Sequence, residues 1–153
     1  MMENWKYFSL QELCASDTAR RLHIENVPDS AQLENLDRLV TTLLDPLREI
    51  WGSPLIVSSG FRCKELNKLV GGVSNSYHLW GLAADIVAPS TLQRSSWVNN
   101  MWLFKLVKQN MKILGVDEVI AEKSSLRRCQ WVHVQIPIFG ISPRYKAFCT
   151  YSR

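Results

Sequence analysis

Two of the three histidines in this chain, together with one aspartate, are side chains of the types that bind divalent transition metals. His78 follows a loop rich in Ser and Asn, Asp85 lies seven residues later, and His133 lies in a later segment. Zinc hydrolases commonly hold the ion with three protein ligands and leave the fourth position to water. Asp85 stands between Ala84 and Ile86, where a buried charge is costly unless it is compensated. A divalent cation would provide that compensation.

The alternation of apolar residues places these ligands on matching faces of two predicted strands. Side chains point to opposite faces at successive positions of a strand. In 131–136 the Val and Ile residues therefore share one face, and His133 lies on the other with Trp131 and Gln135. In 82–87 the Leu and Ile residues share one face, and Asp85 lies on the other with a small Ala. Both ligands thus project away from the bulky apolar groups, toward a possible cleft.

Ordinary structural roles remain open for the same residues. A lone aspartate in a strand is usually at a sheet edge or paired with arginine, and a lone histidine is usually hydrogen-bonded in the core. Two histidines and one aspartate carry little specificity by spacing alone. His23 lies in the polar loop that follows the first predicted helix, and we interpret it as a surface residue.

Four separated motif blocks resemble the zinc D-Ala-D-Ala carboxypeptidases and their relatives. These relatives are the vancomycin-resistance D,D-carboxypeptidases, the phage L-Ala-D-Glu endopeptidase endolysins and the Hedgehog signalling domain. The resemblance covers roughly Tyr7 to Ile136 and is greatest to the short, single-domain bacteriophage members. The blocks occur in the family's order and are Ser59-Gly60-Phe61-Arg62, Leu66-Asn67 with Val70-Gly71-Gly72, Ser76-x-His78-x-x-Gly81-x-Ala83-x-Asp85, and Trp131-Val132-His133-Val134.

The resemblance implies a set of site residues. It implies Zn²⁺ bound by the His-Asp-His set named above. It also implies that Arg62 binds a substrate carboxylate, for which the guanidinium fork is geometrically suited. Ser76 matches a serine that hydrogen-bonds substrate or loop backbone, and Ser59 matches the family less specifically. An ordinary surface arginine in a turn is the alternative for Arg62.

The general base is where this sequence departs from the family. Family members usually carry Asp or Glu three residues before the last histidine ligand, and here that position is Gln130. A neutral amide does not accept a proton from water at pH 7. The nearest alternative carboxylate is Glu122, which matches a Glu of short phage relatives, with Asp117 and Glu118 as weaker candidates. Glu122 is therefore the expected catalytic or supporting carboxylate, unless it is a plain surface residue.

The resemblance implies zinc-dependent hydrolysis of peptide bonds in peptidoglycan stem peptides. The family includes D,D-carboxypeptidases and L-Ala-D-Glu-type endopeptidases, and the compact chain favours an endolysin or wall-remodelling endopeptidase. The alternative is a catalytically inactive zinc-binding module that recognises peptidoglycan or serves in a virion, which Gln130 favours. We expect a monomer whose partner is the stem peptide, without nucleic-acid binding or membrane insertion.

The elements that must position these residues are mixed without regular alternation, which indicates an α+β fold. We expect one domain over 1–153, with an antiparallel sheet packed by helices and a Hedgehog/DD-peptidase-like architecture. Pro46 should kink the second helix, and the tail 137–153 is left as an edge strand or disordered. The expected helices are 10–20, 30–50, 64–70 and 92–114, and the expected strands are 55–57, 82–87, 118–122 and 131–136.

Composition limits the remaining possibilities. The net charge of +4 and pI near 9.0 are too mild to imply nucleic acid and are compatible with an anionic cell wall. No apolar run approaches the ~20 residues of a bilayer span, and the N-terminus lacks a secretion signal. We therefore expect synthesis in the host cytoplasm and action at the wall after release or within a virion. Four widely spaced cysteines are expected to be reduced thiols.

Overall fold

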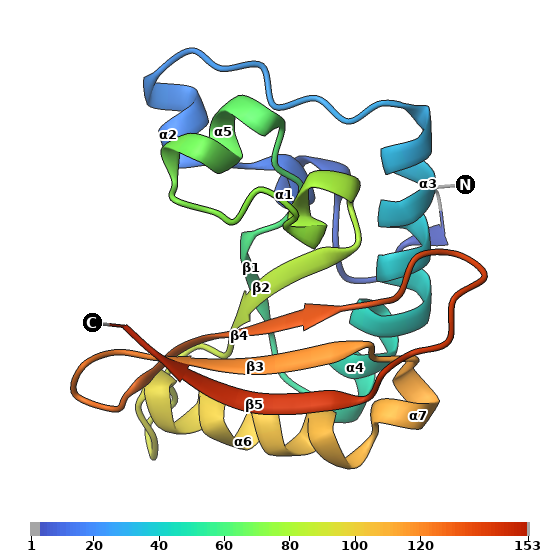
Figure 1. The fold of residues 1–153 in the computed structure, drawn as a ribbon. Coiled ribbons are helices and arrows are strands. Elements are labelled where there is room, and N and C mark those ends of the chain that lie inside the picture. The colour runs from blue at the N-terminus through green and yellow to red at the C-terminus, as the bar shows by residue number, and fades with distance from the viewer. Residues whose placement is uncertain (1–3, 153) are drawn as a thin grey trace.

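A five-stranded sheet lies at the centre of the computed structural model, which describes residues 4–152 (Figure 1). Its order is β1-β2-β4-β3-β5, and every pairing is antiparallel except that of β5 with β3. The α+β fold expected from the sequence is confirmed. The strands are β1 (Ile56–Ser59), β2 (Ala83–Val87), β3 (Glu118–Lys123), β4 (Cys129–Gln135) and β5 (Lys146–Tyr151).

The parallel edge strand β5 is the one exception to the antiparallel sheet predicted from the sequence. Strand β4 is paired on both sides, by β2 and by β3, so β5 cannot form a hairpin with it. The connection 136–145 instead carries the chain back to the free edge of β3, where β5 runs in the same direction as β3. The tail thus forms a strand, one of the two outcomes that the sequence left open.

One face of the sheet is covered by α6 (Ser96–Gln109) and the short α7 (Met111–Leu114). The core lies between this layer and the inward side chains of β3 and β4, among them Val119 and Val132, which are fully buried. The sequence predicted one helix over 92–114. The helix begins only at Ser96, and Asn110 interrupts it with a non-helical φ of −116°.

A second helical unit packs beside the sheet and consists of α3 (Ser30–Leu39), the π-helical turn η2 (Val40–Leu44) and α4 (Asp45–Trp51). Asp29 begins α3 with a capping box that it shares with Gln32. Proline cannot donate a backbone hydrogen bond, and Pro46 lies in the first turn of α4, directly after the π turn. The predicted disturbance at Pro46 therefore takes the form of a widened turn.

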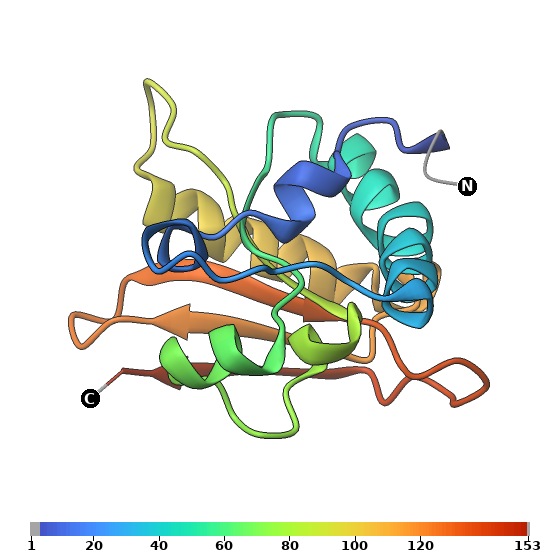
Figure 2. The ribbon, with the colours of Figure 1, turned by 90° about the horizontal axis from the view of Figure 1, so that it is seen from above.

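Short helices form the layer on the other face of the sheet, seen from above in Figure 2. The helix predicted over 10–20 is two helices, because Ala15 is extended and Ser16 caps a new start. These elements and the loops between them cover the face that carries the candidate ligands. They are α1 (Leu10–Cys14), α2 (Asp17–Arg21), α5 (Lys64–Leu69) and the 3₁₀ turn η3 (Tyr77–Trp80).

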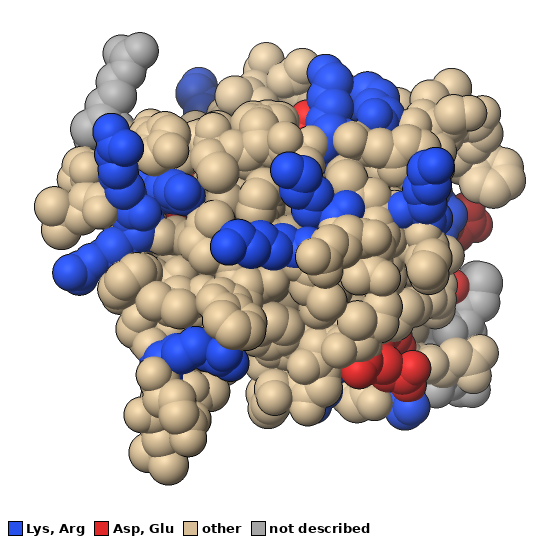
Figure 3. All heavy atoms as spheres, turned by 90° about the horizontal axis from the view of Figure 1, so that it is seen from below, with Lys and Arg blue, Asp and Glu red and all other residues tan. Residues whose placement is uncertain are grey.

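Charge is unevenly distributed over the surface. Residues 86–116 contain no Asp or Glu. On the face that carries α6, Lys and Arg side chains outnumber acidic ones (Figure 3).

All four cysteines are free thiols, as expected.

Within residues 4–152, none of the helices combines the length and apolar character required to cross a bilayer.

Candidate metal centre

Two of the three candidate ligands face each other across neighbouring strands. Asp85 of β2 and His133 of β4 are directly paired in the antiparallel register. Side chains at such positions emerge on the same face with Cβ atoms about 5 Å apart. His133 Nδ1 lies 2.9 Å from Asp85 Oδ1. The alternation seen in the sequence therefore places both residues where it predicts, on the face opposite the buried valines.

The third candidate, His78, is brought to the same carboxylate by the turn η3. The Ser76 side chain caps this turn by accepting a hydrogen bond from the backbone N–H of His78. Gly81 ends the turn with φ +74°, and a Cβ at this position would lie 2.6 Å from the carbonyl oxygen of Gln32. These constraints place His78 Nε2 3.3 Å from Asp85 Oδ1.

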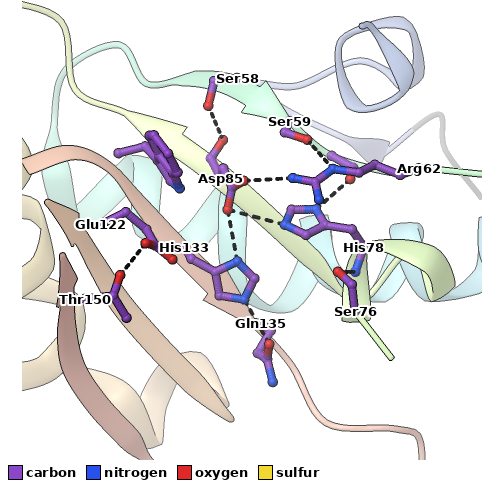
Figure 4. Close-up of polar contacts among 12 residues, drawn as sticks. Ser58, Ser59, Arg62, Ser76, His78, Asp85, Glu122, His133, Gln135 and Thr150 are labelled. Atoms are coloured by element: carbon purple, nitrogen blue, oxygen red, sulfur yellow. Dashed lines mark hydrogen bonds and ion pairs between the residues drawn. The ribbon is translucent and has the colours of Figure 1, made fainter. Parts of the chain in front are cut away.

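The three side chains converge in Figure 4 on a common point. One ligand atom from each lies within 4.8 Å of the other two. The rings of His78 and His133 are 5.2 Å apart and meet edge to face. Of the described residues, only this group of His, Cys, Asp or Glu side chains meets the geometry of a metal site.

Each imidazole has an acceptor on its outer nitrogen. His78 Nδ1 lies 2.7 Å from the carbonyl oxygen of Gly60, and His133 Nε2 lies 2.8 Å from Gln135 Oε1. Since both oxygens only accept, each neutral ring carries its hydrogen on the outer nitrogen. The lone pairs of His78 Nε2 and His133 Nδ1 then both face the carboxylate of Asp85. Two lone pairs and a carboxylate oxygen facing one point form a site for a cation.

The pKa values are consistent with this interpretation. Without a metal, protonated rings can donate to the carboxylate instead: burial raises the pKa of Asp85, but the positive charge of protonated His78 and hydrogen bonds from both protonated histidines lower it more, to well below its ordinary value. Burial lowers the pKa of His133, and the hydrogen bond and charge of Asp85 more than reverse this, so the pKa is raised. The carboxylate is therefore ionised at neutral pH and attracts either a proton or a metal ion to the site.

Arg62 contacts the second oxygen of the same carboxylate. Its Nη2 lies 3.2 Å from Asp85 Oδ2, its Nε donates to Ser59 Oγ at 2.9 Å, and its Nη1 donates to Asn67 Oδ1 at 3.2 Å. Burial lowers the pKa of Arg62, and Asp85 partly offsets the effect. A guanidinium has five N–H donors, so these three bonds leave two N–H groups available, and Arg62 is among the residues that line the adjoining cavity.

An open cavity of about 630 Å³ adjoins the three ligands. Loop 70–77 forms one wall, and the exposed faces of β3 and β4 form the other. The lining residues that carry polar side chains are Arg62, Asn75, Ser76, Tyr77, His78, Asp85, Glu118, Glu122, Trp131, His133, Gln135 and Arg144. The cavity thus brings together Arg62, Ser76, Glu122 and the three ligands predicted from the sequence.

The two candidates for the general base occupy different environments. Glu122 lies in the cavity wall opposite Trp131, and its carboxylate accepts a hydrogen bond from Thr150 Oγ1 (Figure 4). Gln130 lies where the register of β3 and β4 shifts, is exposed, and donates to the carbonyl of Arg128 at 3.2 Å. It is not among the residues that line the cavity. The carboxylates of the wall besides Asp85 are Glu118 and Glu122.

Besides Gln130, two further predicted residues do not line the cavity. The hydroxyl of Ser59 is turned to Arg62, so its contact with a ligand would be indirect. Asp117 is buried and bound by Arg144 and Gln135.

Arg144 and Thr150 were not singled out in the sequence. Both belong to the tail, where no motif marks them. Only the parallel pairing of β5 brings them to the site.

The model of the peptidase M15 family matches residues 6–135. This match includes all three candidate ligands, Arg62 and Glu122, and it ends before the connection that carries Arg144. No curated protein matches the chain at a significant level.

Proposed function

We propose that this chain, which belongs to the peptidase M15 family, hydrolyses peptide bonds in peptidoglycan stem peptides with the help of zinc. The observation that carries the proposal is the convergence of two imidazole lone pairs and one carboxylate beside an open cavity. Family membership supports a metallopeptidase. Zinc and the peptidoglycan substrate are the proposed refinements.

The donor set supports zinc as the metal. Two imidazole nitrogens and one carboxylate oxygen are typical of catalytic zinc sites, which keep a further position open. When bound, zinc supplies Lewis acidity and lowers the pKa of water toward ~7. Asp85 would contribute Oδ1, because Oδ2 is held by Arg62.

The cavity residues have distinct proposed roles. Glu122 is the carboxylate that takes a proton from the attacking water and passes it to the departing amine, as a general base and then a general acid. The hydroxyl of Thr150 orients it. The two remaining N–H groups of Arg62 receive a substrate carboxylate, from a D-Ala terminus or a D-Glu residue, and Ser76 contributes a hydroxyl to the same wall. Such a contact would suit the substrate of either a D,D-carboxypeptidase or an L-Ala-D-Glu-type endopeptidase.

A phage setting is the proposed biological context. The compact chain favours an endolysin or a wall-remodelling endopeptidase that reaches the bacterial wall on release from the host or as part of a virion. This part of the proposal rests on the resemblance to short phage members of the family.

A second candidate is a zinc-binding module that recognises peptidoglycan without cleaving it. The observation that favours it is Gln130, an amide at the position where relatives carry their acidic base. The presence of Glu122 in the cavity wall weighs against it.

The test is digestion of purified peptidoglycan by zinc-loaded protein, with the released fragments identified by mass. Loss of a single alanine identifies a carboxypeptidase, and release of stem peptides identifies an endopeptidase. Asp85→Ala should lose both zinc and cleavage. Asp17→Ala makes the same chemical change on an exposed helix that does not line the cavity and should retain both. Zinc-loaded protein that binds peptidoglycan without cleaving it would support the second candidate and overturn the first.

A further inference from the structure

A chain of hydrogen bonds leads from the tail of the protein to one metal ligand. It runs from Arg144 through Asp117 and Gln135 to His133. We propose that Asp117, held by Arg144, is a positioning residue that determines through Gln135 which nitrogen of His133 binds the metal. This inference rests on the metal site of the proposed function and adds residues that its chemistry does not use.

Asp117 is the fixed point of this chain. Its carboxylate is buried, and Arg144 Nε lies 3.1 Å from both of its oxygens, while Nη2 lies 2.7 Å from Oδ2. The backbone N–H of Arg144 donates to Oδ1 at 3.0 Å. Gln135 Nε2 completes the set at 2.9 Å from Oδ2. An ionised carboxylate only accepts hydrogen bonds, so every neighbour must offer a donor.

That requirement determines the orientation of the amide of Gln135. A side-chain amide has a donor end and an acceptor end, and the donor end must face Asp117. The acceptor end, Oε1, is then left facing His133 Nε2 at 2.8 Å. The imidazole must carry its hydrogen on Nε2, and Nδ1 keeps the lone pair that faces Asp85. A chemical constraint imposed at Asp117 is in this way transmitted to the metal ligand.

The backbone keeps the same partners together. His133 and Gln135 are two residues apart on β4 and therefore share a face. The backbone N–H of Asp117 donates to the carbonyl of Gln135, and the carbonyl of Asp117 accepts from Lys146 at the start of β5. Arg144 lies outside the segment matched by the family model. The tail thus supplies the cation that keeps a buried carboxylate beside Gln135.

A purely structural ion pair is the competing explanation, and it makes different predictions. If Asp117 and Arg144 only stabilise the fold, their loss lowers thermal stability without changing the coordination of His133. If they act through Gln135, changing the carboxylate to an amide alters the metal site even in folded protein. Asp117→Asn presents both a donor and an acceptor to neighbours that all donate. One contact must break, and the amide of Gln135 is free to turn over.

The experiment compares three variants by zinc affinity and by the nitrogen of His133 that binds zinc. Affinity is measured by competition with a chromophoric chelator, and the nitrogen is identified by ¹⁵N NMR of the histidine rings in zinc-loaded protein. Asp117→Asn and Gln135→Met are the test variants, and Gln135→Met leaves the ion pair of Asp117 with Arg144 in place. Glu118→Gln is the matched control. It removes one negative charge at the next position, in β3, from a side chain that also forms an ion pair with Arg144 at 3.5 Å but makes no side-chain hydrogen bond to Gln135 among the described residues.

In the wild type we expect zinc on Nδ1 of His133 and a hydrogen on Nε2. Both test variants should bind zinc more weakly by on the order of 10–100-fold, the usual effect of removing a partner of a ligand. Asp117→Asn should in addition show a mixture of His133 rings with the hydrogen on Nε2 and on Nδ1, and only the first kind leaves Nδ1 free for zinc. The control should stay within about threefold of the wild type, because screening limits the effect of one partly exposed carboxylate. The charge of Glu118 also acts on His133, so the control measures the electrostatic effect of losing one negative charge, and a larger loss in the test variants exceeds that effect.

Three outcomes would overturn the inference. These are zinc on Nε2 of His133 in the wild type, wild-type zinc affinity in the folded test variants, and an equal loss in Glu118→Gln. Thermal unfolding of the chelator-treated proteins shows which variants are folded, and if Asp117→Asn is not, Gln135→Met decides. A wild-type protein without measurable zinc affinity would instead refute the proposed function, and this inference would fall with it.

Discussion

Asp85 is the residue on which both histidines and Arg62 converge. Its two oxygens are divided between these partners, with Oδ1 toward the imidazoles and Oδ2 toward the guanidinium. The guanidinium occupies one oxygen of the carboxylate and leaves the other for a cation. Removing Arg62 would therefore disturb the geometry of the ligand as well as any contact with substrate.

Glu122 provides the sharpest test at this scale. Glu122→Gln should leave zinc affinity close to that of the wild type, because Glu122 is not one of the three converging ligands. The turnover number should fall by roughly 10²–10⁴-fold, the usual contribution of general acid–base catalysis. Steady-state cleavage and zinc competition measure the two quantities. Unchanged turnover would move the role of base to Glu118, the other carboxylate in the wall.

Residues of the site were predictable from the sequence where a local pattern, such as strand alternation, indicates their position. Alternation along two strands was sufficient to place Asp85 and His133 on one face, and the register confirms that placement. Asp117 was considered only as a weaker base, because a buried carboxylate partnered from the distant tail looks like any other acid in the sequence. Arg144 had no local signal, since its role depends on a pairing between β3 and β5.

At the scale of elements, the close contact between α1 and the segment after β1 helps to position one of the candidate ligands. A Cβ on Gly60 would lie 2.2 Å from the carbonyl oxygen of Leu13 and 2.9 Å from its carbonyl carbon. Phe61 donates to that same oxygen at 2.7 Å. The carbonyl of Gly60 in turn accepts from His78 Nδ1. One residue without a side chain thus connects the packing of a helix to the orientation of a ligand.

We therefore expect Gly60→Ala to reduce both stability and metal affinity. Forced separation of the two backbones should cost roughly 1–3 kcal/mol, as overpacking does elsewhere, and should weaken zinc binding by displacing the acceptor of His78. Thermal unfolding and chelator competition measure these effects. Gly140→Ala is the control. Open space surrounds this glycine, so an added Cβ meets no other atom, and only the positive φ of +84° would strain the alanine. The Gly140→Ala variant should lose some stability but should keep the zinc affinity of the wild type. Equal zinc affinity in Gly60→Ala and Gly140→Ala would refute the expectation.

The elements themselves show which sequence signals are sufficient and which are not. The apolar stripe that begins after Asp29 correctly located a long helical segment, although a π turn interrupts it. Ser16 was read as part of one helix, whereas its side chain caps a second one, because a capping serine differs from an interior serine only in its backbone. The proline at position 46 predicted a kink in the helix, but the sequence did not show that the kink would take the form of a π-helical turn.

At the scale of the whole molecule, the metal site couples pH to stability. The pKa of His133 is raised above 6.5 in the metal-free protein, so its proton stabilises the fold fully below pH 6.5. This contribution is lost as the pH rises through the raised pKa. Zinc has the opposite dependence, because it binds the neutral imidazoles and competes with protons.

The expected result is a pair of opposite trends. The unfolding temperature of chelator-treated protein should fall as the pH is raised from 6 to 9, by roughly 2–4 °C for each kcal/mol lost. The rise in unfolding temperature on adding zinc should be larger at pH 8 than at pH 6. The free energy of unfolding gains about 2.7 kcal/mol when the zinc concentration is a hundredfold above the dissociation constant. Calorimetry at several pH values measures both. His133→Asn lacks the titrating ring, and an equally steep fall in this variant would exclude His133 as the cause.

The parallel pairing of β5 has a practical consequence for anyone who trims this protein for expression. A truncated protein that ends at residue 135 would contain the whole segment matched by the family model but would lack all of β5. The backbone groups of β3 would then form an open edge, and such edges recruit other chains and promote aggregation. Insolubility of the shortened product would report on its missing last strand and would say nothing about the catalytic competence of the fold.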